Sequence, residues 1–495
     1  MAIDGVSGRT SFLGSSIHNI KNQLDDLQQQ LASGKVSNTY AGQGPDRGFA
    51  LSLRAQVAGI NAYADTATNI NTRINVANLS LQGLIDIGGQ VKTAANGSAI
   101  TLSSNGQTNG QITAQAQLGN ALALLNTQSG GRYLFSGRAT DTPATASADD
   151  ILNGSGARAG LTQLIAERKQ ADQGVGGLGR IALTSPTATS ISVANDASPF
   201  GLKLNTVSSS LTGATLTPPS GAPAPVSVDL GATNPANGDK IKFTFNLPDG
   251  TTEAIELTAS TATPLPAGSF AIGANSTATT ANLNAALTAS IGTLANSSLV
   301  AASAIAASDN FFDAPPLRVG GPPFNTATTL VNGTAANTVS WYTGEAGTDP
   351  ARGTAVARID QSITVQYGAR ADEQAFRTQL QNIAVYAAVT TSSGDPNANA
   401  QITALSQRVM QNLAPQTGQQ SIQDIQADLA GALTTIKSAT DRQTQTKSLA
   451  QTMLDSIEGV SPDEVATKIL ALQTSLSASY QTTAILYQTS LTKYL

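Results

Sequence analysis

The chain has 495 residues and a formal net charge of −5, and 12% of its residues are charged where about 25% is ordinary. It has no cysteine and one histidine, His18, which excludes disulfides, thiolate metal sites and multi-histidine metal sites. The acidic balance argues against a nucleic-acid surface, because such a surface needs clustered Lys and Arg. A chain of this length and composition is typical of a structural or secreted protein with several domains.

The beginning of the chain, residues 1–16, carries charged side chains and lacks a continuous apolar stretch. We therefore expect no cleaved secretory signal peptide. No run of about 18 apolar residues occurs, so no membrane span is predicted.

Apolar residues near the beginning of the chain recur at alternating spacings of four and three. This pattern predicts a helix with a heptad stripe, which Gly34 ends. A second stripe of the same kind covers residues 60–84, and a third helical stretch covers residues 111–126. The first stripe consists of Leu13, Ile17, Ile20, Leu24, Leu27 and Leu31.

The C-terminal end has the same pattern. Three helical faces are expected within residues 376–387, 422–436 and 449–460. Ser461 suits the N-cap of the last helix, Pro462 its first position, and Glu464 would complete a capping box. The apolar stripe of that helix is predicted to include Val465, Ile469, Leu472, Leu476, Tyr480, Tyr487 and Leu491. We call this stripe and the Leu13–Leu31 stripe together the terminal seam.

The middle of the chain alternates apolar and polar residues. Residues 241–247 and 251–258, joined by a Pro-Asp-Gly turn, predict a β-hairpin. Short strands are expected near residues 226–230 and 363–367, and one helix near residues 280–291. Proline-rich stretches at 218–225 and 315–323 indicate loops.

These patterns predict a mainly α core, with the long N- and C-terminal helices packed as a coiled-coil-like bundle, and an inserted β-rich α+β outer domain. The expected parts are an N-terminal helical part of the core (1–140), a linker (141–185), the outer domain (186–350) and a C-terminal helical part of the core (351–495). The outer domain is expected to make few contacts with the core. Long amphipathic helices near both termini need partners, so we expect the terminal seam to be an assembly surface between subunits.

Several segments resemble the bacterial flagellin family of axial proteins. They are residues 28–35 (QQQLASGK), 53–56 (LRAQ), 131–137 (GRYLFSG) and the final LSASYQTTAILYQTSLTKYL. The GRYLFSG segment and the final Tyr-Leu are more similar to the group of hook–filament junction proteins, which are hook-associated proteins, than to filament flagellins. Residues 42–46 depart from the family, since they carry one acid where the family usually has two.

The resemblance implies a structural, non-enzymatic subunit of the bacterial flagellum that serves cell motility by self-assembly through its terminal helices. Its implied partners are copies of itself, hook-associated proteins, flagellin, an export chaperone and the flagellar export apparatus. It would be extracellular and secreted without a cleaved signal. The long insert keeps a filament-forming flagellin open as an alternative, and a secreted adhesin or fibre protein is a more distant one.

Four features invite other interpretations. Residues 174–179 match G-x-G-x-x-G, but a dinucleotide site needs a strand before the motif and a helix after it, so we interpret them as a flexible linker. His18 is expected to be a partly exposed helix residue. Asp149 and Asp150, and the group Ser308, Asp309, Asn310 and Asp313, lack the spacing of an EF-hand and are interpreted as solvated loop acids, or as a helix N-cap for Asp149. We therefore expect no catalytic, cofactor or metal site.

Overall fold

The computed structural model describes residues 4–97, 100–218 and 225–491, and leaves out the side chains of residues 4–11, 40, 487 and 489–491. Helices account for about 53% of the chain, so the fold is a mainly helical core with a β-containing insert, as predicted. The coiled-coil character of the helix packing stays a prediction. The chain divides into two compact units: the first holds residues up to 71, 357–365 and from 433 onward, and the second holds residues 72–356 and 366–432.

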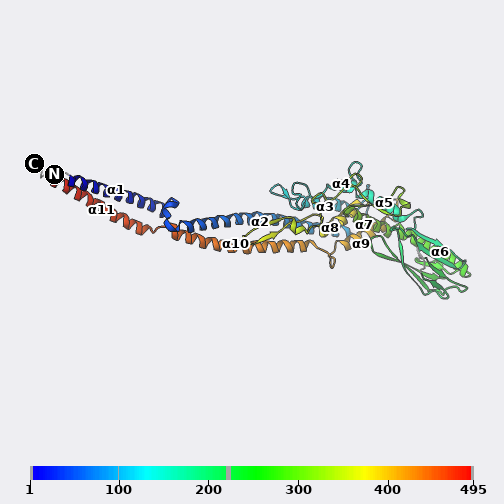
Figure 1. The fold of residues 1–495 in the computed structure, drawn as a ribbon. Helices are drawn as coiled ribbons and strands as arrows, with labels where there is room; N and C mark the ends of the chain where they lie inside the picture. The colour runs from blue at the N-terminus through cyan, green and yellow to red at the C-terminus, as the bar shows by residue number, and fades with distance from the viewer. Residues whose placement is uncertain (1–3, 98–99, 219–224, 492–495) are drawn as a thin grey trace. The chain divides into compact units, whose positions relative to one another are not determined.

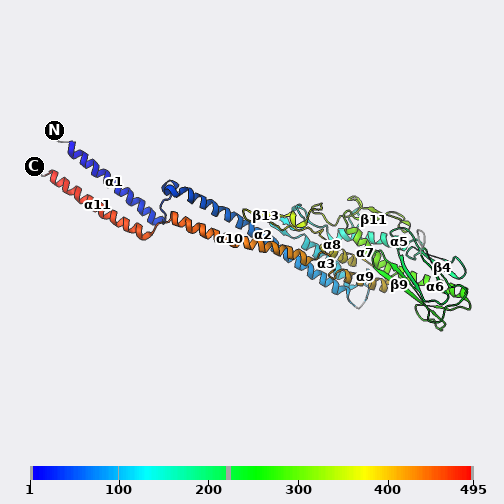
Figure 2. The same cartoon turned by 60° about the horizontal axis from the view of Figure 1, so that its bottom comes forward.

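Helices from both chain ends form the first unit. In it, α1 and α11 lie side by side and antiparallel, so the start of α1 and the end of α11 lie at the same end of the pair (Figures 1 and 2). The unit also contains the first part of α2 and the last part of α10. The bounds of its helices are α1 (Asp4–Ser33), η1 (Tyr40–Asp46), α2 (Arg47–Ala95), α10 (Ile422–Glu458) and α11 (Pro462–Leu491).

The N-cap of α11 follows the prediction in part. The helix begins at Pro462, and Ser461 Oγ accepts a hydrogen bond from Glu464 N at 3.5 Å. The Glu464 carboxylate pairs with Lys468 Nζ at 2.7 Å instead of closing the capping box. Of the two hydrogen bonds of a capping box, only the one accepted by the Ser461 side chain is therefore formed.

A short hairpin of β13 (Val356–Arg358) and β14 (Thr364–Gln366) forms near the predicted strand at 363–367. Its tip is held on α10 within the first unit. Gln443 Nε2 donates to Ile359 O at 2.6 Å, and Arg442 Nη2 pairs with Asp360 Oδ2 at 3.0 Å. The hairpin is thus fixed by polar contacts as well as by the burial of Ile359.

The helices of the second unit pack around α7. Twelve of the fifteen residues of α7 are buried, and the helix contacts α5, α8 and α9. Most of these buried residues are alanines or serines, and small side chains let neighbouring helices approach closely on every side. The helices are α3 (Asn109–Leu125), α4 (Ala148–Asn153), α5 (Leu161–Gln173), α6 (Ser276–Ala295), α7 (Ser298–Phe312), α8 (Gln374–Ala388) and α9 (Ala398–Asn412).

The position of α7 corrects the expected outer domain. This helix lies inside the segment 186–350, yet it forms the centre of the helical packing of the second unit. Trp341, also inside that segment, is buried and donates its indole N–H to Phe312 O at 3.1 Å. The segment 186–350 therefore does not project with few contacts, and only its part before α7 is β-rich.

Two four-stranded sheets make up that β-rich part. Their strand orders are β3-β4-β7-β6 and β10-β9-β8-β5, with only the β9–β10 pair parallel among the described strands. Helix α6 contacts β4, β9 and β10, and contributes Leu283, Leu287 and Ile291 to the shared core. The strands are β3 (Ile181–Thr184), β4 (Ser190–Asn195), β5 (Lys203–Ser209), β6 (Thr215–Thr217), β7 (Val226–Asp229), β8 (Lys240–Asn246), β9 (Thr252–Ser260) and β10 (Ser269–Ala271).

The β-hairpin predicted at 241–258 is confirmed. Strands β8 and β9 are antiparallel, with Lys240 opposite Thr258, and Gly250 takes φ 79° in the connecting turn. Phe243 and Phe245 alternate toward the core, as the period of two requires. The predicted strand near 226–230 and the helix near 280–291 also form, as β7 and α6. Of the predicted loop at 218–225, residues 219–224 lie outside the described residues.

Short elements complete the second unit. Gly131, the first residue of the GRYLFSG segment, and Gly130 before it both take positive φ, and the buried Phe135 packs on Phe376 of α8, with ring centroids 5.8 Å apart. The remaining elements are β1 (Gln128–Ser129), β2 (Arg132–Tyr133), β11 (Leu317–Val319), η2 (Phe324–Thr326), β12 (Leu330–Asn332) and η3 (Ala351–Thr354).

One stretch of the described chain, Ser276–Phe312, has the length and mean hydropathy (1.3) of a membrane span. It consists of α6 and α7, which are separated at Asn296 and Ser297. The chain itself buries 61% of its most apolar window. Such burial within the chain is typical of the core helices of a globular protein.

The glycine motif at 174–179 is an ordered turn, so its interpretation as a flexible linker was wrong. It connects α5 to β3, which is the reverse of the strand-then-helix order that a dinucleotide site requires. Gly179 O accepts a hydrogen bond from Leu202 N at 2.9 Å. A Cβ atom at Gly179 would lie 2.9 Å from the side chains of Leu202 and Leu299, which explains the glycine there.

The two acidic groups also lie elsewhere than expected. Asp309 is on α7 and Asp313 is its C-cap, so neither is a simple loop acid. Ser147, not Asp149, is the N-cap of α4, and its Oγ accepts from Asp150 N at 3.1 Å. His18 is an exposed residue of α1, as expected.

Candidate assembly surface

The α1–α11 pair buries its own apolar side chains incompletely. On α1, the terminal-seam residues Leu13 to Leu27 are all half-buried, and Leu31 is 43% exposed. A two-helix contact covers only one side of each helix. The half-buried side chains therefore retain apolar area that another surface could cover.

On α11, the seam is buried only close to α10. Val465 is 3% exposed and Ile469 is 9% exposed, whereas Leu472 and Leu476 are half-buried. Burial thus decreases toward the C-terminus.

Beyond Leu476 the inward-facing positions differ from those predicted. Ser479, Thr483 and Leu486 are half-buried, which continues the alternating three-four spacing, whereas Tyr480 is 46% exposed. The sequence pattern had followed the larger apolar side chain, Tyr480, which lies outside the contact between the two helices. The side chains of Tyr487 and Leu491 lie outside the described residues.

Further apolar side chains of this pair point away from its contact. Phe12 of α1 is 76% exposed, and Leu470 of α11 is 64% exposed. Together with Tyr480, they present apolar area on faces that the two helices do not use to contact each other. Exposed apolar patches on an otherwise polar surface typically mark interaction sites.

A joint links this pair to the rest of the first unit. Val36 N donates to Glu458 O at 2.7 Å, and Val460 N donates to Gly34 O at 3.1 Å, so the turns after α1 and after α10 hold each other. Arg54 of α2 also pairs with Glu458, with Nη2 and Oε2 2.5 Å apart. The chain therefore bends at this joint twice, once between α1 and α2 and once between α10 and α11 (Figure 2).

Backbone geometry explains the glycines of the joint. Gly34 has φ 68°, which a glycine adopts without steric cost. A Cβ atom at Gly459 would lie 2.4 Å from the backbone oxygen of Asp455. Neither position accepts a larger residue without distortion.

The neighbouring part of the first unit is packed differently. Ala67 and Ile70 of α2, and Ile436 and Ala439 of α10, are each at most 5% exposed. The predicted stripe at 60–84 thus becomes buried within the chain, unlike the terminal seam. Within the first unit, the α1–α11 pair is the part whose apolar heptad stripe is incompletely buried.

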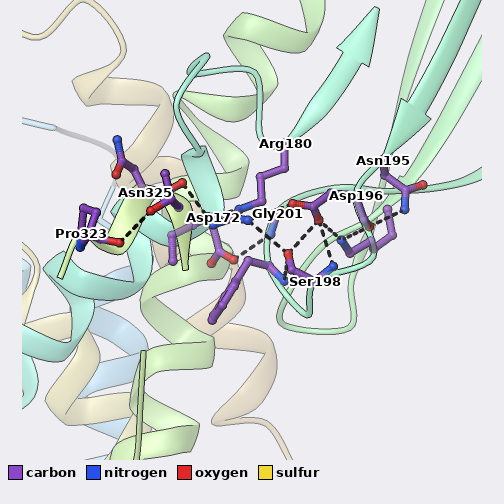
Figure 3. A network of polar contacts seen from close by, with 12 residues as sticks. Asp172, Arg180, Asn195, Asp196, Ser198, Gly201, Pro323 and Asn325 are labelled. Carbon is purple, nitrogen blue, oxygen red and sulfur yellow. Dashed lines mark hydrogen bonds and ion pairs between the residues drawn. The ribbon is translucent and has the colours of Figure 1, made fainter. Parts of the chain in front are cut away.

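A cluster around Arg180, in the second unit, was not predicted from the sequence. Arg180 Nη1 pairs with Asp196 Oδ2 at 2.8 Å, and Nη2 donates to Asn325 O at 3.2 Å (Figure 3). Arg180 is the one non-glycine residue of the described chain with positive φ, at 63°. The guanidinium contacts stabilise a backbone conformation that costs about 1–2 kcal/mol.

Asp172 lies beside this cluster and is fully buried. Its carboxylate pairs with Arg168 Nε at 2.9 Å and accepts from Gly201 N at 2.8 Å (Figure 3). Burial raises the pKa of Asp172, and the Arg168 charge opposes that rise. The guanidinium groups of Arg168 and Arg180 lie 5.1 and 5.3 Å from the centroid of the Phe200 ring.

The Arg180 cluster fixes the β-rich part to α5 and to the loop at 323–326. Burial opposes ionisation of Asp196, but hydrogen bonds from Arg180, Ser198 and Lys203 hold its pKa below the ordinary value. Every charge of the cluster is paired, so it has a structural role and offers no reactive group. A single arginine before a strand gives no sequence pattern from which to find it.

Among the described residues, no group of three or more His, Cys, Asp or Glu side chains is arranged to hold a metal ion. No known protein-family model matches the chain, and no curated protein matches it.

Proposed function

We propose that the chain is a structural, self-assembling subunit of the bacterial flagellum and acts as the hook–filament junction protein, flagellar hook-associated protein 3. The observation that carries the proposal is the incomplete burial of the terminal seam on the α1–α11 pair. The resemblance of residues 28–35 and of the last twenty residues to the flagellin family supports the same assignment.

The mechanism is burial of the terminal seam between subunits. Covering the rest of a half-buried Leu contributes about 1 kcal/mol, and association costs about 4–15 kcal/mol before any gain appears. Several seam positions contacting several neighbours are therefore needed for a stable assembly. Repetition of one heterologous contact around an axis supplies such neighbours.

The joint supports a role for the family-like QQQLASGK segment. Its last residues, Gly34 and Lys35, lie in the turn that pairs with Gly459, where Lys35 and Gly459 form an antiparallel bridge. In an assembled subunit, this contact would set how far α1 and α11 are shifted along each other.

A filament-forming flagellin is the second candidate. It is favoured by the size of the β-containing insert, which is long for a junction protein. A secreted adhesin or fibre protein is more distant, because it would leave the paired terminal helices without a purpose.

Electron microscopy separates these candidates. The purified chain, concentrated and negatively stained, is expected to stay monomeric as a junction protein and to form long filaments as a flagellin. Immunogold labelling on intact flagella should place the protein at one short zone between hook and filament. Absence of label from every part of the flagellum would refute a flagellar role.

A further inference from the structure

A polar cavity of about 340 Å³ lies among α7, α8 and the turn after α9. It uses no residue of the α1–α11 pair, so it concerns a function beyond assembly. Among its described lining residues, Ile305 is the one apolar side chain. The rest of the wall consists of carboxylates, amides, a hydroxyl and one guanidinium.

Most charged groups of this cavity already have partners. Asp249 Oδ2 pairs with Arg408 Nε at 2.6 Å, and Asp313 Oδ1 lies 3.7 Å from Arg377 Nη1. Asp309 is exposed into the cavity and makes no ion pair within the described chain. Desolvation of the carboxyl group by the surrounding protein, together with the charges of Asp313 and Asp249, raises its pKa to about 6. Without a cation of its own, this carboxylate can accept hydrogen bonds from the hydroxyl groups of a ligand.

A second cavity, of about 410 Å³, adjoins the first, because Asp313 and Arg377 line both. Its wall differs in chemistry, since it includes Pro315, Trp341 and Tyr342. The two cavities thus offer a polar compartment beside one with aromatic and proline surfaces.

Two groups of the second cavity bear on its ligand. Arg370 lies over the Tyr342 ring, 5.9 Å from the centroid, and is itself paired with Asp372. Tyr342 Oη is buried beside the Arg370 guanidinium, but no hydrogen bond of good geometry reaches it within the described chain. A buried hydroxyl of this kind is satisfied when a ligand supplies a partner.

The chemistry of the walls excludes several ligand classes. A phosphate is disfavoured, because three aspartates line the first cavity, and Arg377 and Arg370 are both paired with carboxylates. Lipids and apolar peptide anchors need an apolar pocket, which the first cavity lacks. A neutral ligand with many hydroxyl groups fits, because a hydroxyl can donate to a carboxylate or an amide oxygen and can accept from an amide N–H.

We propose that the two adjoining cavities form a binding site for a neutral carbohydrate chain. Sugar hydroxyls would bind to Asp309 and Gln381 in the first cavity, while the less polar faces of a following sugar unit would pack on the Tyr342 side of the second. Each cavity has the volume of an ordinary small-molecule site, about 300–1,000 Å³. The site is thus suited to an oligosaccharide more than to a single sugar.

The test uses the full chain and four trisaccharides: maltotriose, cellotriose, chitotriose and mannotriose. Saturation-transfer NMR followed by calorimetry is expected to detect at least one of them with a Kd of about 1 mM or tighter. Asp309→Ala and Gln381→Ala should each weaken that binding at least about tenfold, a loss of about 1.4 kcal/mol. Asp149→Ala, which removes an acid on α4 outside both cavities, is the matched control and should bind as the parent does.

A second comparison tests the extended site. Tyr342→Phe should weaken the trisaccharide severalfold and leave the affinity for its constituent monosaccharide unchanged, because the monosaccharide would occupy the first cavity alone. Thermal unfolding checks that each variant is folded. The proposal is overturned if none of the four trisaccharides gives saturation transfer at about 10 mM. Equal affinity of the folded Asp309→Ala and Gln381→Ala variants and the parent would overturn it as well.

Discussion

A charge placed in the terminal seam gives the most direct test of the assembly surface. Leu476 of α11 is half-buried in the free chain, while its neighbour Ser477 is exposed. Leu476→Asp and Ser477→Asp therefore add the same carboxylate at adjacent positions, on and off the seam. If subunits cover the seam in the assembly, the two variants should behave differently there.

The magnitude follows from the two environments. In the isolated chain, an aspartate at 476 can turn toward water, so the cost is the lost half-burial of a leucine, about 1 kcal/mol. Between subunits the same carboxylate would be buried without a cation, at a cost of several kcal/mol. A loss of about 4 kcal/mol corresponds to a roughly thousandfold weaker association.

Soft-agar motility and immunoblots of the culture medium provide the assay. Leu476→Asp should be exported, collect in the medium as free subunit and abolish swimming, whereas Ser477→Asp should swim as the parent does. The melting temperature of the isolated protein should change little for either variant. Normal swimming by Leu476→Asp would refute the assembly role of α11, and a collapse of its melting temperature would place the seam in the subunit's own core instead.

Three further predictions concern the second unit. Arg180→Ala should lower the free energy of unfolding by about 3 kcal/mol, measured by urea denaturation, because it removes one of the two cations that pair with Asp196 and leaves the carbonyl oxygens of Ala171 and Asn325 without their donor. Asp309→Asn should raise stability by about 1 kcal/mol at pH 8 and leave it unchanged at pH 4. The pKa of Asp309 is raised from 3.8 to about 6, so the stability that its protonated form provides is complete below pH 3.8 and is lost as the pH rises through 6. The whole shift would correspond to about 3 kcal/mol. The expected change is smaller because solvent screens the carboxyl group. Replacing residues 186–348 with a Gly-Ser linker should unfold the helical part, whereas replacing 181–296 should leave it folded, since only the longer deletion removes α7; circular dichroism distinguishes the two.

Controls sharpen these expectations. Lys240→Ala removes an exposed ion pair with Glu256 and should leave the free energy of unfolding nearly unchanged, because solvent screens such pairs. Equal losses for Lys240→Ala and Arg180→Ala would show that the Arg180 cluster contributes nothing special. A flat difference between Asp309→Asn and the parent from pH 4 to pH 8 would contradict the raised pKa. A folded, soluble protein without residues 186–348 would contradict the central place of α7.

Local patterns in the sequence were enough to predict the helices at both chain ends and the β8–β9 hairpin. Helical periodicity and strand alternation depend on the spacing of neighbouring side chains, which the sequence states directly. The break after α1 at Gly34 and the start of α11 at Pro462 were predictable for the same reason, since both depend on the conformational preferences of single residues.

Only the tertiary structure decided which faces are buried. On α11, spacing alone could not tell whether Tyr480 or Ser479 faces α1, because the larger apolar side chain does not always lie inward. The apolar run of α7 carries no clear stripe, and its position at the centre of the second unit results from α5, α8 and α9, which come from distant parts of the chain.

The Arg180 cluster and the paired cavities show the same limit. Arg180 and Asn325 are 145 residues apart, and Asp309 and Gln381 are 72 apart, so no local pattern relates them. The sequence determined which segments form helices and strands, because those choices depend on near neighbours. The tertiary structure decided which polar groups meet, because that depends on how distant segments pack, and packing is set by contacts that spacing along the chain does not encode.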